Sequence, residues 1–154
     1  MPAILASDIT PLMKISSENK FYYLPAFNGA VVGDSISIGD SANTKNGSIL
    51  PLKEIPIGAK IYNIERNPGD GGKFVRVAGA SATIAKKVDS NIIIIMPNKN
   101  EIKLNERCRA TIGVIAGDGR ILKPFVTAGR KHYKMKARNK LWPRTSAVKM
   151  NAVD

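Results

Sequence analysis

A glycine-rich corner carries the most distinctive chemistry of this chain. It has the order Asn67-Pro-Gly-Asp-Gly-Gly-Lys73, and Arg76 follows three residues later. Three glycines let the backbone adopt positive φ and lie close to a flat or charged partner. Lys73 and Arg76 would then stand beside an exposed row of backbone N–H groups, where an anionic backbone would fit. The alternative is a bulged β-turn with two solvated cations, and the local sequence leaves both interpretations open.

The charge of the chain indicates a polyanionic partner. Lys and Arg number 24 against 12 Asp and Glu, so the net charge is +12 over 154 residues. Residues 1–59 hold four basic and five acidic groups, whereas residues 60–154 hold twenty and seven. Such segregation indicates that one part of the protein faces nucleic acid or an anionic membrane. A membrane-binding helix needs a wide apolar face opposite its cations. The basic C-terminal stretch lacks one, so nucleic acid is favoured.

The stretch from residue 130 to residue 149 has eight basic groups and no acidic one. No apolar period persists in it, so it has no core of its own to bury and is expected to be irregular. It could be a solvated basic tail. We favour an extension that enters RNA grooves, where cations neutralise phosphates and aromatic faces meet bases. The interleaved aromatic residues include Tyr133 and Trp142.

Catalytic and metal-binding residues are scarce. Cys108 and His132 are the single cysteine and the single histidine, which excludes an internal disulfide and argues against a zinc site. His132 paired with Cys108 or Asp118 could form a nucleophile and its base. However, nothing orients His132 within the acid-free stretch, and Cys108 suits packing beside a strand. The sequence therefore predicts no enzyme, no cofactor and no metal site.

Short strands and frequent turns predict a small all-β barrel. Ile92–Ile95 shows no alternation, so we expect a central strand buried on both faces. The pattern of strands ends at about Lys123. The predicted strands cover residues 12–16, 21–24, 29–39, 60–65, 74–78, 82–88, 91–96, 101–105 and 109–115.

Three consecutive aromatic residues, Phe21, Tyr22 and Tyr23, lie in the second of these strands. They could stack on nucleic-acid bases. Packing in the core and across strands is the preferred interpretation, because few cations lie near them.

Several motifs occur together in a specific order. They include Asn67-Pro-Gly-Asp-Gly-Gly, Lys123-Pro-Phe and Met150-Asn-Ala-Val-Asp. With the segments around them, they resemble the family of universal ribosomal protein two of the large subunit, in its archaeal form. The resemblance is specific over residues 50–154 and looser over residues 1–49.

The resemblance implies an all-β fold with three parts. Residues 1–48 would form a partial OB-like barrel and a linker. Residues 49–123 would form an SH3-like β-barrel, and residues 124–154 a basic irregular C-terminal extension that binds rRNA.

The resemblance also implies a function. The chain would be a structural constituent of the large ribosomal subunit that binds rRNA near the peptidyl transferase centre and supports subunit association and translation. Its partners would be large-subunit rRNA, neighbouring ribosomal proteins and the small subunit at the interface, in the cytoplasm and without a membrane. Cofactors are not expected, although structural Mg²⁺ would reach the protein through rRNA. The alternative is a free RNA-binding regulatory or translation-factor module.

The rRNA-binding residues combine two sources. The resemblance places Arg76 on an RNA-contacting arginine of the family, and several other cations on or next to positions that face rRNA. The basic stretch supplies the remaining cations and a tryptophan. The predicted set is Lys73, Arg76, Arg109, Arg130, Lys131, Lys134, Lys136, Arg138, Lys140, Trp142 and Arg144.

The chain also departs from the family pattern. Family members carry a long segment before the first residue of this chain, and a glycine-rich loop with a histidine after its last. We therefore expect a fragment, a split gene product or a shortened homologue. An OB barrel without its first strands would expose a sheet edge, which another chain or RNA must cover.

Overall fold

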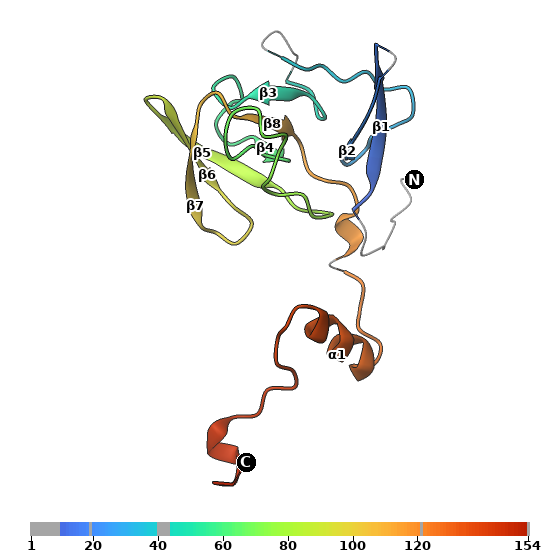
Figure 1. The fold of residues 1–154 in the computed structure, drawn as a ribbon, viewed down its shortest axis with the longest axis vertical. Helices are drawn as coiled ribbons and strands as arrows, with labels where there is room; N and C mark the ends of the chain where they lie inside the picture. The colour runs from blue at the N-terminus through green and yellow to red at the C-terminus, as the bar shows by residue number, and fades with distance from the viewer. Residues whose placement is uncertain (1–9, 19, 40–43, 121, 154) are drawn as a thin grey trace. The chain divides into compact units, whose positions relative to one another are not determined.

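The computed structural model describes residues 10–18, 20–39, 44–120 and 122–153. It divides the chain into two compact units, residues 1–122 and 123–154 (Figure 1). Residue 19, between the predicted strands 12–16 and 21–24, and residues 40–43, within the predicted OB-like part and linker, lie outside the described residues. The further division of the first unit at residue 48 stays a prediction.

The first unit begins with a β-hairpin. Strands β1 (Leu12–Ser17) and β2 (Lys20–Pro25) pair antiparallel in a two-stranded sheet. Pro25 is the last residue of β2, where its lack of an N–H to donate to a ladder is tolerated.

Six further strands form one antiparallel sheet in the order β3-β8-β4-β5-β6-β7. A tight turn joins β5 to β6, and in it Asp89 has a φ of 51°. The all-β class is confirmed, and the arrangement is consistent with an OB-like part followed by an SH3-like barrel. The strands are β3 (Ile49–Pro51), β4 (Lys60–Tyr62), β5 (Ala82–Val88), β6 (Asn91–Ile95), β7 (Glu101–Asn105) and β8 (Arg109–Ile112).

One hydrophobic cluster fills the inside of this sheet and includes residues from all six strands. Its members are aliphatic side chains with one thiol, so the cluster excludes water without needing internal polar partners. It fixes the sheet that carries the glycine-rich corner. The buried members include Leu50, Leu52, Ile55, Ile61, Ile64, Ile84, Ile92, Ile94, Leu104 and Cys108.

A smaller cluster joins the hairpin to the sheet. Tyr62 is fully buried with Phe27 and Ile115, and Met13 of β1 packs against them. The Tyr62 hydroxyl donates a hydrogen bond of 3.2 Å to the carbonyl oxygen of Pro25 at the end of β2. Burial raises the pKa of the Tyr62 phenol, which keeps it a neutral donor.

Two predicted strands are wrong. Residues 29–39 form turns, with positive φ at Gly29, Gly33 and Gly39, and only Ile38 makes an isolated bridge. Residues 74–78 likewise contribute only the bridge from Phe74 to Ile64. Glycine frees the backbone in the first segment. In the second, Val75 has a φ of 53°, which lies outside extended strand geometry.

The prediction for residues 92–95 is correct for the central position of the strand and wrong for its burial on both faces. β6 is central in hydrogen-bonding order, but only one of its faces packs on the core. Ile92 and Ile94 are buried, whereas Ile93 is half-buried and Ile95 is 38% exposed. Strands β5 and β7 pair with the backbone of β6 on its two sides, but no element covers its outer face among the described residues.

The sequence predicted an irregular C-terminal extension, but part of the second unit is helical. It contains the helix α1 (Ala128–Ala137), none of whose residues is buried. Alanine, lysine, arginine and methionine are good helix formers even without an apolar face. Lys134 and Lys136 lie in the last turn, where their positive charges interact favourably with the negative end of the helix dipole. Asn139, with a φ of 51°, ends it in the left-handed conformation.

We expect Tyr62→Phe to lower the free energy of unfolding by about 1–2 kcal/mol, because the buried Pro25 carbonyl loses its donor. Urea denaturation followed by circular dichroism measures this. Tyr22→Phe is the matched control, since Tyr22 is 51% exposed, and we expect a change below about 0.5 kcal/mol. Equal effects of the two substitutions would contradict the role given to the Tyr62 hydroxyl.

Candidate nucleic-acid interface

The glycine-rich corner is held from inside by two carboxylates. One oxygen of Asp70 accepts hydrogen bonds from the N–H groups of Arg66 (3.0 Å) and Asn67 (3.1 Å). The other accepts from the N–H of Gly72 at 3.2 Å. This arrangement is the local turn that aspartate commonly stabilises between glycines.

Glu65 is the second carboxylate and is only 7% exposed. Its oxygens accept hydrogen bonds from Gly69 N–H (3.1 Å) and Gly71 N–H (3.4 Å). The same side chain accepts from the N–H of Arg109, the first residue of β8, at 2.8 Å. A buried carboxylate is tolerated when it accepts several hydrogen bonds. Glu65 therefore joins the corner to the edge of the sheet.

The predicted row of exposed N–H groups is absent from this corner. The groups of residues 66, 67, 69, 71 and 72 donate to the two carboxylates. Those of Asp70, Lys73 and Phe74 donate to backbone carbonyls, and Pro68 has none. Phosphate binding here would therefore fall to side chains, and the exposed Lys73 and Arg76 stay the predicted ones.

Gly72 is required at its position by a close approach. A Cβ atom there would lie 2.5 Å from Oδ1 of Asn63 and 2.8 Å from its carbonyl oxygen. Its φ of +87° is also unfavourable for other residues. Asn63 Oδ1 is buried and has no hydrogen-bond partner among the described residues. By contrast, a Cβ at Gly69 or Gly71 would meet nothing within 4 Å.

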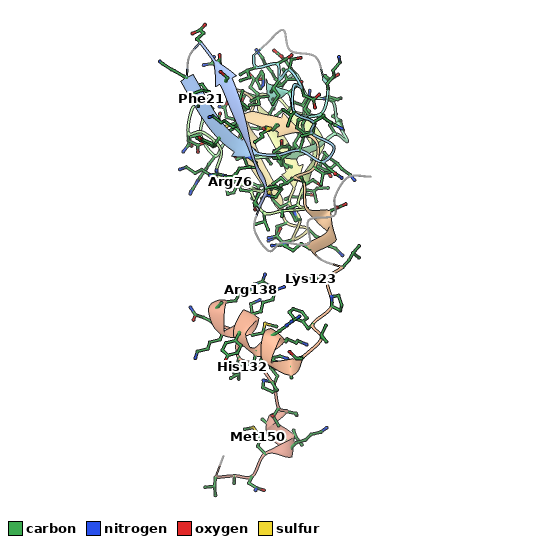
Figure 2. All side chains as sticks on the ribbon, turned by 90° about the vertical axis from the view of Figure 1, so that its right-hand side faces the viewer. Phe21, Arg76, Lys123, His132, Arg138 and Met150 are labelled. Carbon is green, nitrogen blue, oxygen red and sulfur yellow. The ribbon has the colours of Figure 1, made fainter. Side chains whose placement is uncertain are left out.

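Thr10 positions the backbone of Arg76. Its hydroxyl donates to the carbonyl oxygen of Arg76 (3.2 Å) and accepts from the N–H of Ala78 (3.2 Å). This one side chain therefore makes two hydrogen bonds to the backbone of the segment that carries Arg76. Figure 2 labels Arg76 on the first unit.

The surroundings of the corner shift the pKa of the Asp70 carboxyl and of the Cys108 thiol. Partial burial raises the pKa of the Asp70 carboxyl, but the N–H groups of Asn67, Gly72 and Arg66 lower it, so its pKa lies below the usual value of 3.8. Burial raises the pKa of the Cys108 thiol, and the nearby Glu65 carboxylate raises it further. The thiol donates to the Arg66 carbonyl at 3.6 Å. A buried, protonated thiol does not suit a nucleophile.

The predicted interface residues fall on both units. Lys73, Arg76 and Arg109 belong to the first, and Glu65 brings the backbone of Arg109 to the corner. The other eight belong to the second unit, where all but Lys131, Lys134 and Trp142 are exposed. Sequence analysis missed Glu65 and Asp70, although Asp between glycines is a known turn signal.

Cation–π contacts organise the second unit. Lys134 Nζ lies 4.7 Å from the centre of the Phe125 ring, and Lys131 Nζ lies 5.1 Å from that of Trp142. Such exposed contacts contribute about 0.5–1 kcal/mol each. Tyr133 is 71% exposed, so its ring remains open to a partner. Figure 2 labels His132 on α1 and Arg138 immediately after the last residue of this helix.

The preference for packing Phe21, Tyr22 and Tyr23 in the core is wrong. Their side chains are 57%, 51% and 62% exposed. Burial in β2 is confined to its last residues, Leu24 and Pro25, so the three aromatic side chains before them stay exposed on both faces of the hairpin.

In residues 10–18, 20–39, 44–120 and 122–153, no group of three or more His, Cys, Asp or Glu side chains could hold a metal ion. Within those same ranges, the only helices are too short or too polar to span a bilayer.

Comparison with known proteins gives consistent results. Residues 45–154 match the family described as Ribosomal Proteins L2, C-terminal domain. The large ribosomal subunit protein uL2 of Natronomonas pharaonis is 52% identical over 126 residues, which cover 82% of this chain and 52% of that protein. The uL2 proteins of Methanosphaerula palustris and Halorubrum lacusprofundi are 45% and 48% identical, over 93% and 94% of this chain and 60% of each relative. The chain thus spans between half and two thirds of their length.

We expect Glu65→Ala to lower the free energy of unfolding by about 3 kcal/mol or more, because three N–H groups lose a charged acceptor. Chemical denaturation measures the loss. Glu101→Ala is the control, since Glu101 is exposed on β7, and should change stability by less than about 0.5 kcal/mol. A stable Glu65→Ala protein would show that the corner does not depend on this carboxylate.

Stability should also depend on Asp70 in acid. Because its pKa is lower in the folded protein, its contribution is present above the unfolded pKa and disappears as the pH falls through the folded one. The stability difference between wild type and Asp70→Asn should therefore shrink from about pH 5 to about pH 2. Urea titrations across that range measure it. A difference that stays constant with pH would contradict the role of the charge.

Proposed function

The chain belongs to the L2 family of ribosomal proteins, and from this premise we propose that it is a structural constituent of the large ribosomal subunit that binds ribosomal RNA. Its resemblance to the archaeal form of the family is confirmed. The family consists of ribosomal structural proteins, and we propose that this chain has no catalytic activity. The ribosome in the cytoplasm is its proposed location.

The second unit carries the main support for RNA binding. Residues 123–154 contain nine basic residues and one acidic residue, Asp154. The helix α1 buries none of its residues, and an isolated helix of ten residues is marginal in water. RNA would supply both the counter-charge and the contacts that this unit lacks.

The first unit adds a rigid set of cations. Lys73 and Arg76 follow a corner whose backbone is hydrogen-bonded internally, so both side chains start from fixed positions. Binding to phosphates then costs less conformational freedom than binding from a mobile loop. Such contacts position a protein on RNA and read little sequence.

Finer roles follow from the resemblance and are part of the same proposal. They are contact with rRNA near the peptidyl transferase centre, contact with neighbouring ribosomal proteins, and support of subunit association. Structural Mg²⁺ would arrive with the RNA. Cosedimentation separates this role from that of a free factor, because a ribosomal constituent stays with large subunits that are washed in high salt.

The test is the salt dependence of binding to rRNA fragments. If about six phosphates are contacted, the affinity should fall about a thousandfold between about 50 and about 200 mM salt. Replacing both Arg130 and Lys136 by Gln should reduce the slope of log affinity against log salt by about two. Filter binding measures both quantities.

The control removes the same charge elsewhere. Lys86 and Lys103 are exposed on β5 and β7, outside the proposed interface. Replacing both by Gln should leave the slope nearly unchanged. A wild-type affinity that does not change with salt would overturn the proposal. Equal slopes for the two double variants would show that net charge alone attracts the RNA.

A further inference from the structure

One face of the β1–β2 hairpin exposes two aromatic rings. Side chains alternate along a strand, and residues paired across an antiparallel ladder share a face. Met13 faces the cluster of Tyr62 and its neighbours, so Leu12 and Lys14 face the other way. Phe21 and Tyr23 share that outward face, because Tyr23 pairs with Lys14 and Phe21 pairs with Ser16.

The exposure of this face is large for apolar side chains. Leu12 is 63% exposed, Phe21 57% and Tyr23 62%. Figure 2 shows Phe21 on the hairpin. Neither ring packs against another element of the chain among the described contacts, apart from one lysine.

That lysine is Lys14, whose Nζ lies 3.9 Å from the centre of the Phe21 ring. It is also the only charged side chain on this face among the described residues of the two strands. A single cation therefore stands between two exposed aromatic rings.

We propose that this face, formed by Lys14, Phe21 and Tyr23, is a stacking platform for unpaired RNA bases. The inference rests on the proposed function and adds a second kind of contact to it. In this arrangement the two rings hold bases, and Lys14 leaves the Phe21 ring to contact a phosphate. An exposed cation–π contact is weaker than stacking of a base on an aromatic ring, so the exchange favours the bound state.

The spacing of the rings selects single strands. Phe21 and Tyr23 are two residues apart on one strand, which separates them by about 7 Å. Successive bases in a duplex strand are only about 3.4 Å apart. Each ring can therefore take its own base only from an extended, unstacked segment, which is the form in which RNA bases are commonly recognised.

A protein partner fits this face less well. An apolar protein surface that covered Phe21 and Tyr23 would also bury the charge of Lys14, which is costly without an anionic partner. A polyanion with planar bases meets both requirements. Among the classes of macromolecule, the chemistry of the face therefore favours RNA.

The test compares an oligouridine of about ten nucleotides with an RNA duplex of the same length, by fluorescence anisotropy with the whole chain. Phe21→Leu and Tyr23→Leu keep apolar bulk but remove the ring. Each should weaken binding of the single strand about tenfold and leave duplex binding unchanged. Phe21→Trp should retain single-strand affinity. Because stacking releases no counterions, the ratio of wild-type to variant affinity should stay constant as salt rises.

Tyr22→Leu is the matched control, since Tyr22 lies on the opposite face of the same strand and is 51% exposed. It should change single-strand affinity by less than about twofold. Circular dichroism melting checks that all variants are folded, and Phe21→Trp provides rescue if a leucine variant is not.

Several results would overturn the inference. One is that Phe21→Leu and Tyr23→Leu bind oligouridine as tightly as the wild type does. Another is that these variants lose as much affinity for the duplex as for oligouridine. A third is that Tyr22→Leu loses as much affinity for oligouridine as they do. Self-association of the chain that Phe21→Leu abolishes, with RNA binding unchanged, would show that the face binds protein. In all these cases salt-dependent binding to rRNA would persist. Failure of the wild type to bind any RNA would instead overturn the proposed function.

Discussion

The carboxylate of Glu65 is the constraint on which the described interface of the first unit depends. A buried charge is stable only when enough donors surround it, and the N–H groups of Gly69, Gly71 and Arg109 provide them. Satisfying this one side chain folds the glycine-rich corner back over the sheet and joins it to the start of β8. That internal hydrogen bonding fixes the backbone from which the side chains of Lys73 and Arg76 extend.

The position of the corner and of its cations could be predicted from the sequence, but the internal hydrogen bonding of the corner could not. Glycine, proline and aspartate mark a turn wherever they cluster, so its position was readable. Asn63 and Glu65 occupy the polar positions of an alternating segment and would ordinarily face solvent. The corner covers them instead, and both are only 7% exposed. That burial depends on a contact between chain segments, which local pattern cannot reveal.

The same distinction separates the other predictions. The all-β class followed from strand length and turn frequency, which are local properties. Burial of Ile93 and of the three aromatic residues from Phe21 to Tyr23 was predicted wrongly, because it depends on which faces of the sheet are covered. The helix α1 was missed because it has no apolar period. Its residues favour a helix individually, and its lysines contact aromatic rings outside the helix.

The buried thiol of Cys108 gives this molecule an internal reporter. It lies beneath the corner with its Sγ hydrogen-bonded to the Arg66 carbonyl, and the sequence contains no second thiol. A thiol-reactive dye can reach it only while that region opens transiently, so the labelling rate measures the frequency of local opening. If the thiol is labelled more slowly when RNA is bound, the ratio of the two rates measures how far the ligand suppresses local opening of the backbone beneath it.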